Sequence, residues 1–240
     1  MVDHDLVERI TKEVMRQLGG NIDSTQPASV KMPDVANTVR TSRNIPVGVS
    51  ARHIHLCEEH LFALFGSGAK LNSVRDLPQP GEFAAEERVT LVGPRLRAIE
   101  NVRVLGPLRS FTQVEISRTD ARILGMNPPV RQSGNLRDTP GVTIIGPVGT
   151  VVLEEGVIIA NRHIHLTPED AGFFGVYDNE EVDVRVISRK PTILGKVQIR
   201  ISPEFVLYMH LDTDDANACA IDENASVEIL KPEVSKCCWE

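Results

Sequence analysis

The chain has 240 residues, of which 41% are hydrophobic and 25% charged, and its formal net charge is −7. No apolar run approaches the ~20 residues of a membrane span, and the acidic balance argues against the uniform basic face of a nucleic-acid binder. The first residues lack a secretory signal and the four cysteines show no CxxC spacing, so we expect a cytoplasmic protein with reduced thiols.

The chain begins with a predicted amphipathic helix within residues 1–20. Apolar residues recur every four positions from Leu6 to Leu18 and form one stripe along it. Residues 21–44 are rich in Ser, Thr, Asn and Pro, which predicts a flexible linker. A helix of this length is marginal alone in water. A tethered apolar stripe therefore favours contact with a partner protein over packing of the helix onto its own domain.

From residue 45 onward the pattern is typical of a mainly β protein. Short apolar runs rich in β-branched residues alternate with Gly and Pro. The clearest predicted strands are 46–49, 89–92, 102–105, 142–145, 182–187 and 197–201. Short helices are expected after Glu58, at 120–124 and at 214–220. Many short strands favour barrels or sandwiches.

An internal repeat divides this part of the chain into related halves. Residues 47–56, VGVSARHIHL, return as residues 157–166, VIIANRHIHL. A helix-start pattern follows each copy, and in the second copy Thr167-Pro168 is a good N-cap and first helical residue. In the first copy Cys57 stands where a Ser or Thr cap is expected, which leaves a packing role or a reactive thiol open.

The repeated histidines predict metal sites. Residues two apart in a strand point to the same face, so His53 and His55 can bind one ion, as can His163 and His165. His210 lies where an apolar strand meets a polar turn, and is either a further ligand or a capped strand-end histidine. Imidazole ligands suit zinc, which keeps open positions when a site is catalytic.

Arginines gather in one segment of this acidic chain. Residues 88–137 contain nine Arg, no Lys and three acidic residues. Guanidinium groups bind phosphate or carboxylate with paired hydrogen bonds, although a solvated strand face would look the same. Strand alternation over residues 109–117 would place Arg109, Gln113 and Glu115 on one face. An anion-binding arginine and a carboxylate ligand would then share a wall.

Several segments together resemble one known family. They are the two RHIHL copies, DLPQPGEFAAEERV at 76–89, GPLRSFTQVEISRTDARILG at 106–125 and HLDTDDAN at 210–217. These residues, within a match over 45–228, are similar to the PduL-type phosphate propanoyltransferases of bacterial microcompartments. The resemblance implies two β-barrel domains capped by short α-helices, with the N-terminal strand joining the C-terminal barrel, and a homodimer.

The sequence pattern and the resemblance together predict a domain division, and the resemblance implies a set of site residues. The expected segments are a targeting helix at 1–20, a linker at 21–44, a strand with the first HIH motif at 45–56, a central barrel at 57–150, a C-terminal barrel at 151–230 and a tail at 231–240. The implied ligands of two zinc ions are His53, His55, Glu115, His163, His165 and His210. Arg109 is implied as the catalytic phosphate-binding residue. The implied neighbours of the phosphate or acyl group are Gln113, Ser133 and Arg200, and those of coenzyme A are Ser50, Arg75, Arg103 and Asn217.

The implied activity is acyl-CoA + phosphate ⇌ acyl phosphate + CoA inside a bacterial microcompartment, with residues 1–20 binding shell or core proteins. A dinuclear zinc thioester hydrolase would share the histidines but use water, and a non-catalytic scaffold would rely on the lead helix. Acetyl and propionyl groups differ by one methylene, which a pocket distinguishes by only ~1–3 kcal/mol, so the sequence leaves the acyl group open.

Overall fold

The computed structural model describes residues 43–230, which form a mainly β protein as expected. The predicted lead helix, the linker up to residue 42 and the tail from residue 231 lie outside the described residues. None of the described helices is long and apolar enough to cross a membrane.

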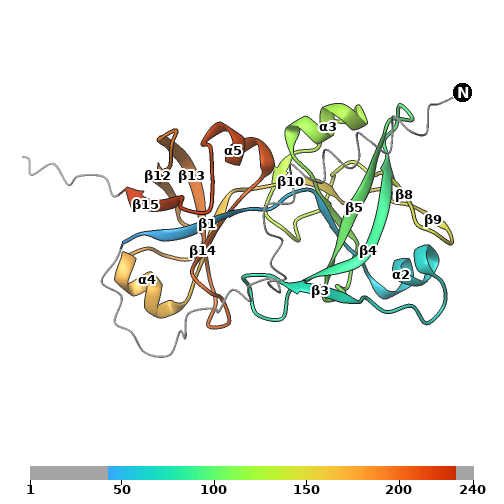
Figure 1. The fold of residues 1–240 in the computed structure, drawn as a ribbon, viewed down its shortest axis with the longest axis horizontal. Helices are drawn as coiled ribbons and strands as arrows, with labels where there is room; N and C mark the ends of the chain where they lie inside the picture. Colours follow the sequence, from blue (N-terminus) through green and yellow to red (C-terminus); the bar gives the residue numbers. More distant parts are fainter. Residues whose placement is uncertain (1–42, 231–240) are drawn as a thin grey trace, which may run out of the picture. The chain divides into compact units, whose positions relative to one another are not determined.

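The described strands form two sheets, one closed and one open (Figure 1). The closed barrel has the order β1 (Ile45–Val49), β14 (Tyr208–Leu211), β11 (His163–Leu166), β13 (Thr192–Ile201), β12 (Glu181–Ile187) and β15 (Ser226–Leu230). The nine-stranded sheet has the order β7 (Val130–Arg131), β10 (Val157–Ala160), β6 (Gln113–Glu115), β2 (His53–His55), β5 (Ala98–Gly106), β4 (Phe83–Val92), β8 (Thr143–Ile145) and β9 (Thr150–Val152), with β3 (Ser73–Asp76) paired to β4. One of the two expected barrels is therefore closed, and the other is an open sheet.

Each sheet encloses its own apolar core. The barrel core includes alternate residues of β12, where Val182, Val184 and Val186 face inward and the residues between them are exposed. This alternation is what a strand with one buried face requires. The nine-stranded sheet packs a separate set of buried residues that includes Ile54, Leu91 and Val104. Two cores of this kind make two structural halves.

Within residues 43–230, four short helices each follow a strand. They are α2 (Glu58–Phe65), α3 (Arg118–Leu124), α4 (Pro168–Phe174) and α5 (Thr213–Ala218). Ser117 and Thr167 form capping boxes with Asp120 and Asp170, and Asp212 caps α5 by accepting from the Asp215 N–H. These local hydrogen bonds satisfy backbone N–H groups that would otherwise lack partners. The three predicted helical patches are confirmed.

The two repeat copies each span both halves. In the first copy β1 lies in the barrel, parallel to β14, and the chain then enters the nine-stranded sheet as β2. In the second copy β10 lies in the nine-stranded sheet, parallel to β6, and the chain then enters the barrel as β11. Figure 1 shows the blue strand β1 among the orange and red strands of the barrel.

This exchange moves the boundaries expected from the sequence. The segment 45–56 is divided between the two halves, because β1 belongs to the barrel and β2 to the sheet. The expected start of the C-terminal barrel at residue 151 also differs from the structure, because β10 extends the nine-stranded sheet as far as Ala160. The boundary moves because β10 pairs with β6, whereas the next strand of the repeat, β11, pairs with β13 and β14.

Candidate active site

The candidate site lies where the repeat crosses between the halves, and equivalent strand pairs supply its ligands. In the sheet, β2 pairs antiparallel with β6, and His53 lies opposite Glu115. In the barrel, β11 pairs antiparallel with β14, and His163 lies opposite His210. The same backbone arrangement therefore presents a candidate ligand set in each half.

Each of these strands ends in the same way. The helix N-caps Cys57, Ser117, Thr167 and Asp212 each follow a candidate ligand by two positions, namely His55, Glu115, His165 and His210. The last ligand thus sits near the strand end, beside the capped first turn of a helix. The sequence signal for all four is a His or Glu, one apolar residue and a cap.

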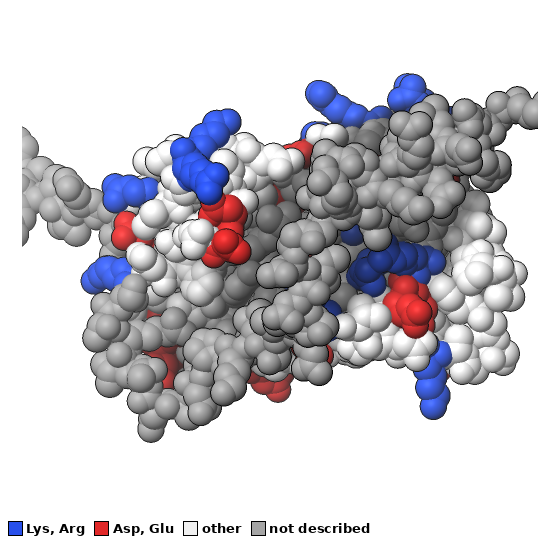
Figure 2. Space-filling view, in the orientation of Figure 1, with Lys and Arg blue, Asp and Glu red and all other residues white. Residues whose placement is uncertain are grey.

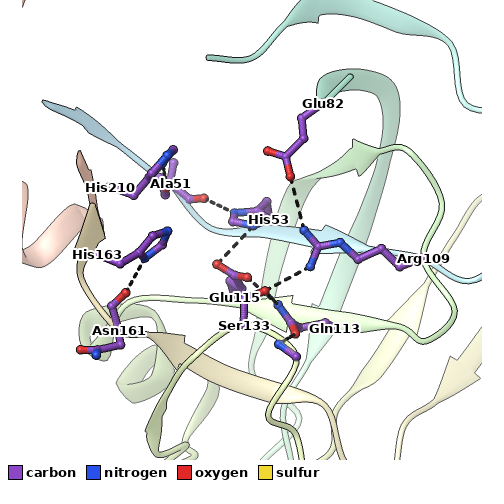
Figure 3. A network of polar contacts seen from close by, with 12 residues as sticks. Ala51, His53, Glu82, Arg109, Gln113, Glu115, Ser133, Asn161, His163 and His210 are labelled. Carbon is purple, nitrogen blue, oxygen red and sulfur yellow. Dashed lines mark hydrogen bonds and ion pairs between the residues drawn. The ribbon is translucent and has the colours of Figure 1, made fainter. Parts of the chain in front are cut away.

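The ligand set of the nine-stranded sheet comprises His53, His55 and Glu115. One ligand atom from each lies within 4.8 Å of the others. The His53 Nδ1–H donates to the Ala51 carbonyl at 2.8 Å, which leaves Nε2 facing a Glu115 oxygen at 3.4 Å (Figure 3). A hydrogen bond from the other ring nitrogen to a carbonyl fixes the tautomer of a ligating histidine.

The ligand set of the barrel comprises His163, His165 and His210, again with ligand atoms within 4.8 Å of one another. The His163 Nδ1–H donates to the Asn161 carbonyl at 2.8 Å, as His53 does to Ala51 in the other half. Nδ1 of His210 lies 3.4 Å from the Ser50 hydroxyl oxygen. The carbonyls and the hydroxyl come from the two crossing segments.

The buried nitrogens of these rings fit a metal site. Four of them, His55 Nδ1, His165 Nδ1, His165 Nε2 and His210 Nε2, are buried and have no hydrogen-bond partner among the described residues. Unpaired buried polar atoms are costly and uncommon unless a function needs them. Because the unpaired atoms belong to the same rings that form the two ligand sets, these sets are suited to a cation.

Burial holds four of the candidate ligand histidines in the neutral state, which is the state that binds metal. Burial is the main cause that lowers the pKa of His55 and of His165 from 6.5 to about 2, and of His210 to about 3. Burial also lowers the pKa of His163. Neighbouring histidines and arginines add to the effect for His55, His165 and His210, since each protonated ring would meet other positive charges.

Arg109 lies beside the sheet's ligand set and is held by two partners. Its Nη1 donates to the Ser133 hydroxyl at 3.1 Å, and its Nη2 lies 3.6 Å from a Glu82 carboxylate oxygen (Figure 3). The Gln113 amide donates to the same Ser133 oxygen at 2.8 Å and also to Glu115. A single hydrogen-bonded chain thus connects the arginine to the carboxylate ligand.

The predicted strand over 109–117 is shorter than expected. The strand β6 begins only at Gln113, and Arg109 precedes it in a turn whose backbone N–H donates to the Leu56 carbonyl. Arg109 therefore reaches the site from a loop rather than from a strand face. Phe111, within this turn, is 39% exposed.

One cavity of about 520 Å³ joins these groups. Both ligand sets contribute to its wall, together with Arg109 and Arg200. Of the other predicted site residues, Ser50, Arg75, Arg103 and Ser133 line it. Gln113 is fully buried behind Ser133, and Asn217 is exposed on α5 and is not among the residues that line the cavity.

Among the wall residues to which the sequence gave no site role are Glu82 and Tyr208. Glu82 lies within the segment 76–89, whose pattern carried the resemblance but gave no partner for it. Burial raises the pKa of Glu82, although the neighbouring Arg109 works in the opposite direction. Tyr208 precedes His210 by two positions on β14, so strand alternation could have placed it on the same face.

The arginine of each RHIHL copy has a structural explanation. Arg52 forms an ion pair of 2.6 Å with Asp120, and Arg162 forms one of 3.5 Å with Asp215. Each carboxylate belongs to the first turn of the helix that follows the partner strand. The repeated arginines therefore fasten the crossing segments to α3 and α5.

Charged side chains of both signs occur together on the surface. On the face shown in Figure 2, the visible described residues include Lys and Arg next to Asp and Glu rather than one continuous basic area. This distribution agrees with the acidic net charge of −7. The cationic groups that matter for the site, Arg109 and Arg200, lie in the cavity wall instead.

Comparison with known proteins gives one consistent result. A family model described as phosphate propanoyltransferase matches residues 46–222, which include every predicted site residue. A phosphate propanoyltransferase of Thermotoga maritima is 52% identical over 202 residues, covering 84% of this chain and 96% of the relative.

Two further relatives carry the same name. The protein of Lachnoclostridium phytofermentans is 50% identical over 191 residues, covering 80% of this chain and 89% of its own length. The protein of Rhodopseudomonas palustris is 42% identical over 231 residues, covering 96% of this chain and 99% of its own length. The family match therefore covers most of the described residues, and the alignment with the last relative, over 231 residues, extends beyond them.

Proposed function

The chain belongs to the phosphate propanoyltransferase family, and from this we propose that it exchanges an acyl group between coenzyme A and inorganic phosphate. The reaction is acyl-CoA + phosphate ⇌ acyl phosphate + CoA. A phosphate oxygen attacks the thioester carbonyl carbon, the C–S bond breaks, and the sulfur leaves as a thiolate that takes up a proton. Both substrates are anionic, so the site must bind negative charge.

The observation that carries this proposal is the convergence of two ligand sets and two arginines on one cavity. Arg109 and Arg200 both line it, and each can pair with a phosphate through two parallel hydrogen bonds. Burial lowers the pKa of Arg200, which indicates that its charge is poorly solvated. A dianion in the cavity would supply the missing counter-charge.

Ser133 is suited to complete the phosphate site. Its hydroxyl oxygen accepts from both Arg109 and Gln113. The hydroxyl proton is then free to donate to a phosphate oxygen. Arg109 and Ser133 would thus both donate to the bound phosphate, and the reactants gain from fixed orientation and proximity.

We propose zinc as the metal, with one ion in each ligand set. Nitrogen-rich sets with one carboxylate suit zinc, and three protein ligands leave a coordination position open for substrate. Bound zinc supplies Lewis-acid polarisation of a carbonyl or phosphate oxygen. The chain's own contribution is to orient the imidazoles, through the Ala51 and Asn161 carbonyls and the Ser50 hydroxyl. Burial, which lowers the pKa of His55, His163, His165 and His210, keeps these rings neutral.

Coenzyme A is proposed to enter over the wall formed by Ser50, Arg75 and Arg103. All three line the cavity, and one Arg103 nitrogen donates to the Ala85 carbonyl, which fixes the side chain. The role expected for Asn217 stays a prediction, because its exposed position on α5 would require coenzyme A to extend beyond the cavity.

The cellular setting is a separate proposal. The predicted amphipathic helix within residues 1–20 would direct the enzyme from the cytoplasm into a bacterial microcompartment through shell or core proteins, and the enzyme would act as a homodimer. Deleting residues 1–20 should abolish co-localisation with the shell while leaving turnover intact. Sedimentation analysis at several concentrations tests the dimer.

The activity is tested by free-thiol release from acetyl-CoA and propionyl-CoA, with and without phosphate, on protein of known zinc content. Phosphate-dependent release with formation of acyl phosphate supports the proposal and ranks the two acyl groups. Release that ignores phosphate would instead identify a thioester hydrolase. No release from folded, metal-loaded protein would favour the scaffold.

Arg109→Ala is the specific variant for the phosphate site. It should raise the KM for phosphate and lower kcat by about 10²–10³-fold, the usual cost of one charge-stabilising donor. Arg137→Ala is the matched control, because the Arg137 side chain is about 90% exposed and is not among the residues that line the cavity. Equal effects of the two substitutions would argue against the assigned role.

A further inference from the structure

A tight turn between β3 and β4 connects the two halves of the protein. It comprises Gln79-Pro80-Gly81-Glu82, and the Glu82 N–H donates to the Gln79 carbonyl at 3.2 Å. Gly81 has a φ of 76°, which an L-amino acid with a side chain adopts only with strain. The Leu77 N–H donates to the Glu82 carbonyl at 3.0 Å and closes the turn at its base. These bonds make the turn a rigid unit.

The Gln79 side chain binds this turn to the barrel. Its Nε2 donates to the Val206 carbonyl and its Oε1 accepts from the Val206 N–H, both at 3.0 Å. Gln79 is only 4% exposed, so the two bonds are shielded from water. A glutamine amide that satisfies both backbone groups of one residue fixes distance and direction together.

Both ends of this connection lead to the candidate site. On the sheet side, the Glu82 carboxylate lies 3.6 Å from the Arg109 guanidinium. On the barrel side, Phe205 precedes Val206, and its ring stacks on His165 with a centroid distance of 4.0 Å. The Arg200 guanidinium also lies over the Phe205 ring, 5.7 Å from its centroid.

We propose that Gln79 is a positioning residue that sets where the Arg109 guanidinium lies relative to the histidines of the barrel. The inference rests on the proposed function, because Arg109 is the phosphate-binding group of that reaction. Gln79 is neither a ligand nor among the residues that line the cavity, and acts through the turn and Glu82. The upper part of Figure 3 shows Glu82 reaching Arg109 from the side opposite Ser133.

Removing the two hydrogen bonds between Gln79 and Val206 should lower kcat more than it lowers the stability of the fold. Gln79→Met keeps the length of the side chain and removes both hydrogen bonds. We expect kcat to fall about 10- to 100-fold, since a displacement of about 1 Å at a reacting group can cost 10²-fold, and the KM for phosphate to rise. Zinc content should stay as in the unchanged protein, because neither ligand set loses a member.

The matched control is Thr139→Val. Thr139 is 5% exposed and also makes one bond as donor, to the Leu136 carbonyl, and one as acceptor, from the Gly156 N–H. It is not among the residues that line the cavity. Thr139→Val should lower the melting temperature as much as Gln79→Met while leaving kcat and the KM for phosphate within about twofold.

A double-mutant cycle with Glu82→Gln tests the route of the effect. If Gln79 acts through Glu82 and Arg109, the double variant should be no slower than the slower single variant, because one displacement of Arg109 occurs in all three. Losses that multiply would overturn the proposal. So would a Gln79→Met protein whose kinetics match those of Thr139→Val.

The failure of this inference can be told apart from failure of the proposed function. The function fails if the unchanged protein releases no thiol in response to phosphate. In that case the same cycle is measured as the affinity of the metal-loaded protein for inorganic phosphate, by calorimetry. Gln79→Met should weaken that affinity at least fivefold, and an unchanged affinity would refute the positioning role.

Discussion

The closed barrel and the open nine-stranded sheet present equivalent positions with different side chains. Gly48 in the barrel pairs with His210, and its repeat counterpart Ile158 in the sheet pairs with Glu115. The barrel places Tyr208 opposite His165, whereas the sheet places Gln113 opposite His55. One backbone plan therefore carries an all-histidine set in one half and a carboxylate-containing set in the other.

In each half, a larger side chain at one of these positions is matched by a smaller side chain at its neighbour. A Cβ atom at position 48 would lie 2.1 Å from the Tyr208 hydroxyl oxygen, so the tyrosine requires a glycine there. In the sheet the smaller Gln113 leaves room for Ile158, which is fully buried. The result is a hydrogen-bonded chain to Arg109 in the sheet and an aromatic wall in the barrel. Under the proposed function, the sheet half would bind the phosphate and the barrel half would orient its metal.

Loss of a ligand from either half should have the largest effect. His53→Ala and His163→Ala should each reduce zinc from two ions per chain to one and lower kcat by at least about 10³-fold, since Lewis-acid assistance is worth several kcal/mol. Zinc analysis and thiol release measure this. If one variant kept full activity with one zinc ion, the metal site that this variant lacks would have only a structural role.

Exchange of the differing ligands sharpens the comparison. Glu115→His should lower kcat about 10²-fold, because it removes the carboxylate that balances Arg109 and Arg200 and the acceptor for Gln113. His210→Glu keeps a ligand group at position 210 and should lower kcat by only about tenfold. The kcat and the zinc content of both variants are the measurements that test these two expected losses. Equal losses would show that the two sets are interchangeable.

Acid should destabilise the metal-free barrel more than the metal-free sheet. The barrel's three histidines all have lowered pKa values in the folded state, against an ordinary value of 6.5 that the unfolded chain keeps. Their contribution is therefore present above pH 6.5 and is lost as the pH falls. The loss is about 1.4 kcal/mol per histidine for each pH unit. Hydrogen exchange at pH 7 and pH 5.5, after chelation, should show barrel peptides opening first, and the opposite order would contradict this.

Adding a Cβ atom at Gly48, in the space that the Tyr208 side chain occupies, should have a smaller effect on the protein. Gly48→Ala forces the ring away from its place 5.2 Å from the His210 ring and should cost about 1–3 kcal/mol of stability. Ile158→Val in the sheet is the matched change and should cost about 1 kcal/mol. Urea unfolding with zinc present gives both values. A neutral Gly48→Ala would mean that Tyr208 has another position available.

The smallest effect is expected on the outer surface of the barrel. Gly172 lies within α4, and a Cβ atom there meets nothing within 4 Å. Gly172→Ala should therefore stabilise the protein by about 0.5–1 kcal/mol through helix propensity, with kinetics unchanged. A lower melting temperature would indicate that the glycine has a packing role outside the described contacts.

Local pattern was enough to predict the ligands and much of the fold. His53 and His55 share a face because strand side chains alternate, and Thr167 with Pro168 begins a helix because of capping. The strand predicted at 182–187 is confirmed by β12, which spans Glu181–Ile187. Each of these features depends on residues within a few positions of one another. The assigned roles of the ligands stay predictions until metal is measured.

Other features depended on contacts between distant parts of the chain. Nothing near Gln79 indicates that it bonds to Val206, and nothing near Glu82 indicates Arg109 as its neighbour. The helix N-cap Cys57 also depends on a distant residue. Its backbone N–H donates to the Thr112 hydroxyl at 3.1 Å rather than to a side chain of its own helix. A search of the sequence for a capping box does not find such a bond.

The sequence by itself determined the two histidine motifs, their repetition, the helix starts and the mainly β character, because alternation and capping act over a few residues. Only the tertiary structure decided that β1 pairs with β14 and β10 with β6, so that each repeat crosses from one half to the other. That choice is made by burial of apolar faces over the whole chain, since any exposed strand edge can in principle accept another strand. The crossing brings the two ligand sets to a single cavity.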